Sequence, residues 1–73
     1  MKNFKDFNEA SEKYETIIIE VLGIDNTWRK IEGGIANRPQ SIARALEYAK
    51  KRYPKNRVRA IGQNSGKFYD MLP

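Results

Sequence analysis

Basic side chains are concentrated in one short segment of this 73-residue chain. Six of the ten residues at positions 50–59 (KKRYPKNRVR) are Lys or Arg, and none is acidic. Such side chains can neutralise successive phosphates, so the segment predicts polyanion binding that weakens with salt and reads little base sequence. The candidate contacts are Lys50, Lys51, Arg52, Lys55, Arg57 and Arg59, with Arg44 and Lys67 as flanking contributors.

The two halves of this basic segment differ in how well a structural role explains them. Residues 50–52 are expected to end a helix, where cations complement the negative end of the helix dipole. Pro54 stops that helix, and the cations at positions 55, 57 and 59 follow it with no comparable structural reason. The later cations are therefore the better candidates for contacts with a partner.

Four aromatic residues near the basic segment could stack on nucleic-acid bases. Tyr53 and Phe68 are expected on buried faces of their elements, which leaves Tyr48 and Tyr69 as the stacking or interface candidates. Packing in or around the core is the competing role for both tyrosines. Trp28, the sole tryptophan, is expected to anchor the core.

A glycine pair suggests a weaker candidate anion site formed by Gly33, Gly34 and Arg38. The pair leads toward the start of a predicted helix, where free backbone N–H groups can bind phosphate. The segment matches neither GxxxxGK[ST] nor GxGxxG, and Pro39 removes one of the donors. A bulge or a close approach of two chain segments is the better explanation for the glycines.

The residue types that carry most enzyme chemistry are missing. The chain has no cysteine and no histidine, which excludes disulfides, thiolate metal sites and histidine general bases. Ser11, Ser41 and Ser65 therefore have no histidine to activate them, and the acidic residues form no recognisable pair. We expect a protein that is not an enzyme and that needs no metal or cofactor.

Charge is divided unevenly along the chain. Residues 1–37 carry five basic and seven acidic side chains, a net −2, whereas residues 38–73 carry nine and two, a net +7. The two parts sum to a net charge of +5. A positive field concentrated in one half of the chain attracts polyanions or acidic protein surfaces. No secretory signal or membrane span is visible, and the absence of cysteine suits a reducing compartment, so a soluble cytoplasmic protein is expected.

Hydrophobic periodicity and turn residues predict the secondary structure. The expected strands are 16–22, 28–35, 57–62 and 67–72, with turns at 23–26 and 63–66 and a helix from 37 to 53. Asn37 and Gln40 have the spacing of a capping box. Residues 1–14 form a separate amphipathic segment, either a short helix or a frayed end, ahead of a single domain at 15–73.

These elements predict a small two-layer α+β domain of order (α)ββαββ, with a largely antiparallel sheet and the helix packed on one face. The opposite face would present Ile18, Leu22, Arg57, Arg59 and Ile61. Its cover would come from the N-terminal segment or from a partner, including a second copy of the chain in a homodimer.

Two functions fit these features. The first is a small basic binding protein that contacts DNA or RNA through its C-terminal half. The alternative is a protein–protein interaction module, an inhibitor or adaptor, that binds an acidic partner surface. In its compact element order without catalytic residues, the chain resembles small accessory proteins of phages and bacteria, although no motif carries the resemblance.

Overall fold

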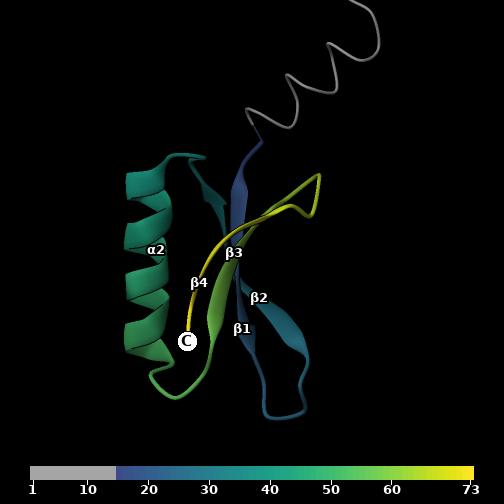
Figure 1. The fold of residues 1–73 in the computed structure, drawn as a ribbon, viewed down its shortest axis with the longest axis vertical. Coiled ribbons are helices and arrows are strands. Elements are labelled where there is room, and N and C mark those ends of the chain that lie inside the picture. The colour runs from purple at the N-terminus through teal and green to yellow at the C-terminus, as the bar shows by residue number, and fades with distance from the viewer. Residues whose placement is uncertain (1–14) are drawn as a thin grey trace, which may run out of the picture.

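The computed structural model describes residues 15–73, which form four strands and one helix (Figure 1). The elements in chain order are β1 (Ile17–Leu22), β2 (Trp28–Ile35), α2 (Pro39–Arg52), β3 (Val58–Gly62) and β4 (Phe68–Leu72). This confirms the predicted α+β class and the ββαββ order. The amphipathic segment predicted ahead of β1, a short helix or a frayed end, lies outside the described residues.

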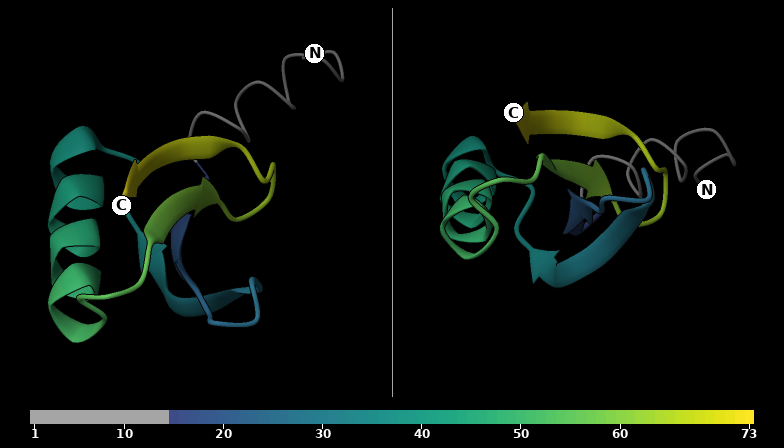
Figure 2. Two further views of the ribbon diagram at one scale, coloured as in Figure 1. Left: turned by 60° about the horizontal axis from the view of Figure 1, so that its bottom comes forward. Right: turned by 90° about the horizontal axis from the view of Figure 1, so that it is seen from below.

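The sheet has the strand order β2-β1-β3-β4, and every neighbouring pair is antiparallel. Because β2 and β3 both run opposite to β1, they run in the same direction on its two sides. Parallel strands need a long crossover, and α2 supplies it. The helix therefore lies across one face of the sheet, as both views in Figure 2 show.

A small core fills the space between α2 and the sheet. Alternate residues of β1 point to the helix, and their burial follows this alternation. The helix contributes one apolar stripe, as its spacing predicted, and β3 contributes its inward positions. The buried apolar side chains are Ile17, Ile19, Val21, Ile42, Leu46, Ala49, Val58 and Ala60.

The start of α2 differs from the prediction. Arg38 is the N-cap residue and has extended backbone angles, but no side chain caps the helix. The predicted capping box is wrong because the Asn37 side chain bonds elsewhere: its amide Nδ2 donates to the Tyr69 hydroxyl oxygen, 3.2 Å away. Pro39, whose φ is already near the helical value, occupies the first turn.

A bulge in β4 overturns the expected burial of its aromatic residues. Ala60 pairs with Asp70, and the next residue, Ile61, pairs with Phe68, so Tyr69 is an extra residue in the ladder. The shift changes which face each aromatic side chain occupies. Phe68, predicted to be buried, is 55% exposed, whereas Tyr69 packs against the core.

A buried carboxylate joins the start of β1 to the turn between β3 and β4. Glu15 is 4% exposed, and its Oε1 accepts hydrogen bonds from the backbone N–H groups of Asn64 (2.9 Å) and Ser65 (2.8 Å). Its Oε2 accepts from the hydroxyls of Ser65 (2.5 Å) and Tyr69 (3.2 Å). Burial raises the pKa of Glu15, but these hydrogen bonds outweigh that effect and hold the pKa below its ordinary value.

Gly62 makes room for this Glu15 network. A Cβ atom at position 62 would lie 2.2 Å from Oε2 of Glu15, which is well inside van der Waals contact. Any other residue would displace the carboxylate from its donors. The same Cβ would lie 2.7 Å from the Ser65 hydroxyl oxygen, so both members of the network require the glycine.

Candidate functional site

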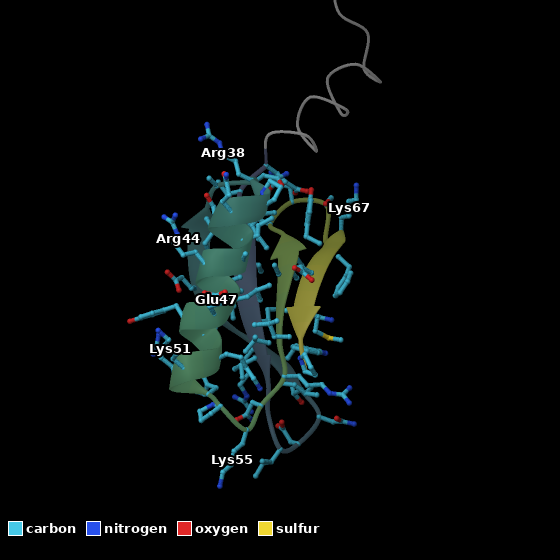
Figure 3. All side chains as sticks on the ribbon, turned by 60° about the vertical axis from the view of Figure 1, so that its left-hand side comes forward. Arg38, Arg44, Glu47, Lys51, Lys55 and Lys67 are labelled. Carbon is cyan, nitrogen blue, oxygen red and sulfur yellow. The ribbon has the colours of Figure 1, made fainter. Side chains whose placement is uncertain are left out.

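Exposed cations lie along the helix side of the molecule. Arg38, Arg44, Lys51 and Lys55, which we call the helix stripe, lie beside α2 in Figure 3, with the exposed side chain of Glu47 between Arg44 and Lys51. Within residues 15–73, the ion pairs join Arg29 to Asp25 and Arg59 to Glu20, so no ion pair neutralises the stripe. The four side chains are exposed.

An exposed aromatic ring lies among these cations. Tyr48 is 56% exposed, and the Arg52 guanidinium carbon lies 5.9 Å from the centroid of its ring. The same carbon lies 5.5 Å from the ring centroid of Tyr53, at the end of the helix. These distances suit cation–π contacts, which hold the exposed Arg52 side chain beside Tyr48.

A shallow groove of about 410 Å³ runs between α2 and the edge strand β2. Its lining is partly apolar and carries four polar or charged side chains. The lining residues are Glu32, Ile35, Ala36, Ser41, Arg44, Ala45 and Tyr48. Sequence reasoning missed this groove because it depends on how the helix is placed against the strand, which no local pattern encodes.

Two cations of the predicted basic segment serve the fold. Nζ of Lys50 donates to the carbonyl oxygens of Pro54 (3.1 Å) and Asn56 (2.7 Å), which fixes the turn between α2 and β3. Arg59 is 2.7 Å from a carboxylate oxygen of Glu20 on the neighbouring strand. Arg59 is therefore paired with a carboxylate, whereas Lys50 keeps its net charge and uses its donors on the backbone.

The remaining predicted cations are spread over different parts of the surface. Arg57 is exposed just before β3, and its carbonyl oxygen accepts a hydrogen bond from the backbone N–H of Leu22. Lys67 lies apart from the helix stripe, on the β4 side in Figure 3. Its Nζ is 5.5 Å from the ring centroid of Tyr69. Of the predicted cations, Arg44, Lys51 and Lys55 therefore lie together beside α2, and Lys67 lies on a different part of the surface.

The two tyrosine candidates have different surroundings. Tyr48 is open to solvent on the helix, as a stacking residue must be. Tyr69 is half-buried against the core, and its hydroxyl takes part in hydrogen bonds with Glu15 and Asn37. The geometry thus favours Tyr48 as a contact residue and gives Tyr69 a structural role.

The glycine pair lies inside a strand. Gly33 and Gly34 are both residues of β2, whereas the link into the helix is made by residues 36–38. Gly34 has a φ of 70°, a conformation that other residues rarely adopt. The positions of the two glycines agree with a role in the geometry of the strand. Arg38 is exposed at the start of α2 and is not part of that strand.

The face of the sheet opposite α2 is open in the part of the chain that the structure describes. Trp28 pairs with Leu22 on this face, so the tryptophan is outside the core, contrary to expectation. The Arg59 guanidinium carbon lies 4.1 Å from its ring centroid. Phe68 and Met71, at the β4 edge, are 55% and 38% exposed. The open sheet face is the name we give to the surface formed by Ile18, Leu22, Trp28, Arg59, Ile61, Phe68 and Met71.

Comparison with known proteins returns no matching family model, no matching curated protein and no matching solved structure. Among residues 15–73, no helix is long and apolar enough to cross a membrane. The same residues contain no group of three or more side chains suited to hold a metal ion. The site must therefore be interpreted from its own geometry.

Proposed function

We propose that this chain is a non-enzymatic binding protein that contacts nucleic acid through the helix stripe. The supporting observation is the row of exposed cations beside α2, free of ion pairs within residues 15–73 and bordering the exposed ring of Tyr48. Arg44 and Lys51 are separated by about 10 Å along a helix axis, so they can reach different phosphates. Binding of this kind depends on several phosphate contacts and on release of counterions.

Wild-type binding to nucleic acid is the first test of this proposal. Fluorescently labelled single strands and duplexes of mixed sequence are titrated with the protein at low salt. Affinity should fall steeply as salt is added, because each phosphate contact releases counterions. Absence of binding to both ligands at low salt would contradict the proposal.

Lys50 and Lys51 are neighbours that should separate stability from binding. Lys51→Gln removes an exposed stripe cation from the last turn of α2, so we expect nucleic-acid binding to weaken by about three-fold with only a small loss of stability. Lys50→Gln replaces the ammonium group that donates to two backbone carbonyls by a shorter, neutral amide, so we expect a loss of about 1 kcal/mol in the free energy of unfolding. Urea unfolding and anisotropy titrations of both variants measure this difference.

The two variants have the same net charge, so a general charge effect cannot distinguish them. Equal losses of affinity in the two would show that the total charge, and not the stripe, governs binding. That result would remove Lys51 from the proposed contacts.

A second candidate is a protein-binding module of the inhibitor or adaptor type that binds an acidic partner surface and uses the open sheet face for affinity. The exposed Phe68 and Met71 favour it, because aromatic residues and methionine are enriched in protein interfaces. The first partner to test is a second copy of the chain. On this alternative, sedimentation equilibrium should detect a dimer that Phe68→Ser converts to a monomer; a monomer at all concentrations would exclude self-association through this face.

A further inference from the structure

We infer that the bound polyanion is a single-stranded nucleic acid and that the groove between α2 and β2 holds one of its unpaired bases. This inference rests on the proposed function and names the form of nucleic acid that the same site would take. The groove adjoins the helix stripe. Arg44 belongs to both, so a strand that follows the stripe passes the mouth of the groove.

The groove has the chemistry of a base site. Ile35, Ala36 and Ala45 give it apolar surface, and Tyr48 adds an aromatic ring that is 56% exposed. Aromatic side chains stack on the faces of unpaired bases, and this stacking is a main source of affinity for single strands. In a duplex the base faces are covered by neighbouring base pairs, so the ring of Tyr48 has nothing to stack on. The groove therefore favours a single strand over a duplex.

Glu32 gives the groove a preference among bases. It is the acidic side chain of the lining, it is half-buried, and within residues 15–73 it makes no ion pair and no side-chain hydrogen bond. A carboxylate accepts hydrogen bonds from amino groups such as N4 of cytosine and is repelled by carbonyl oxygens such as O4 of thymine. Because these two pyrimidines have rings of similar size, the groove should distinguish them by the group at ring position 4, which is an amino group in cytosine and a carbonyl oxygen in thymine.

Fluorescence anisotropy with labelled oligomers of about ten nucleotides tests the inference. At neutral pH, oligo-dC should bind more tightly than oligo-dT by about five-fold, and a duplex of the same length should bind more weakly than oligo-dC. Tyr48→Ala should weaken oligo-dC binding by about ten-fold, whereas Tyr48→Phe, which keeps the ring, should bind like the wild type.

Glu32→Gln is the matched test of base preference. Removing this negative charge should strengthen the binding of every oligomer, so the informative quantity is the ratio of the oligo-dC and oligo-dT affinities. We expect this ratio to fall to near unity in the variant. Ribonucleotide versions of both oligomers should show the same preference for cytosine.

Failure of this inference differs from failure of the proposed function. If single strands and duplexes bind equally and Tyr48→Ala changes neither, the groove does not hold a base, although the stripe still contacts phosphates. If cytosine and thymine oligomers bind equally to the wild type, the role of Glu32 is wrong. If no nucleic acid binds at low salt, the proposed function itself fails.

Discussion

Replacing Glu15 by alanine is expected to lower the free energy of unfolding by about 2 kcal/mol. The substitution removes one buried carboxylate that accepts hydrogen bonds from two backbone N–H groups and two hydroxyls. Asn64 and Ser65 are exposed, so water replaces part of what they lose. A loss of this size is serious for so small a domain, whose total stability is about 5 kcal/mol. Urea unfolding followed by circular dichroism measures it.

The pH dependence of stability isolates the charge of Glu15. Because hydrogen bonds hold the folded pKa below its ordinary value, the stabilisation is fully present above the pKa of the unfolded chain. It is lost as the pH falls through the folded pKa. Glu15→Gln keeps the shape of the side chain without its charge, so the difference in stability from the wild type should shrink in acid.

Asp25 also titrates in acid with a lowered pKa, caused first by the hydrogen bond from the Thr27 backbone N–H. It is present in both proteins, so its effect cancels in the comparison. An unchanged difference between the wild type and Glu15→Gln from neutral pH to acid would show that the charge of Glu15 does not stabilise the fold.

Neutralising three cations of the helix stripe is expected to have the largest effect on binding. The variant Arg44→Gln/Lys51→Gln/Lys55→Gln should bind nucleic acid between about ten-fold and about a hundred-fold more weakly than the wild type at low salt. All three side chains are exposed and make no ion pair within residues 15–73, so stability should change little. Anisotropy titrations with urea unfolding as a companion measurement establish both results.

A second triple variant controls for net charge. Arg29→Gln/Lys30→Gln/Lys67→Gln removes the same number of cations from other exposed positions. Arg29 forms an exposed ion pair with Asp25, and such pairs contribute little to stability. This control should keep most of the affinity of the wild type. If both variants weaken binding equally, the interaction is a diffuse charge effect without a defined site.

Local patterns were sufficient to predict most of the fold. The alternation of β1 and the apolar stripe of α2 predicted the faces that are buried, since both follow from the repeat of a single element. The wrong predictions concern residues whose burial is set by how their strand pairs with a neighbouring strand. The bulge at Tyr69 exchanged the expected environments of Phe68 and Tyr69, and pairing with Leu22 placed Trp28 on the open sheet face.

For the candidate site, the sequence predicted the types of residue but not their arrangement in space. The sequence indicated which residues are basic, but the tertiary structure determines which of them have partners within the chain. Lys50 is bound to backbone carbonyls and Arg59 to a glutamate 39 positions away in sequence. The Glu15 network joins residues about 50 positions apart, and the groove joins a strand to a helix. Neither has a signature in local spacing.

The salt dependence of binding shows whether the helix stripe contacts phosphates. The slope of log K against log salt concentration counts the phosphates that the protein neutralises, at about 0.7 per contact for a single strand. We expect the stripe variant to have a slope smaller than that of the wild type by about 2, and the control triple variant to keep most of the wild-type slope. Identical slopes for the wild type and the stripe variant would contradict it, because Arg44, Lys51 and Lys55 would then contact no phosphate.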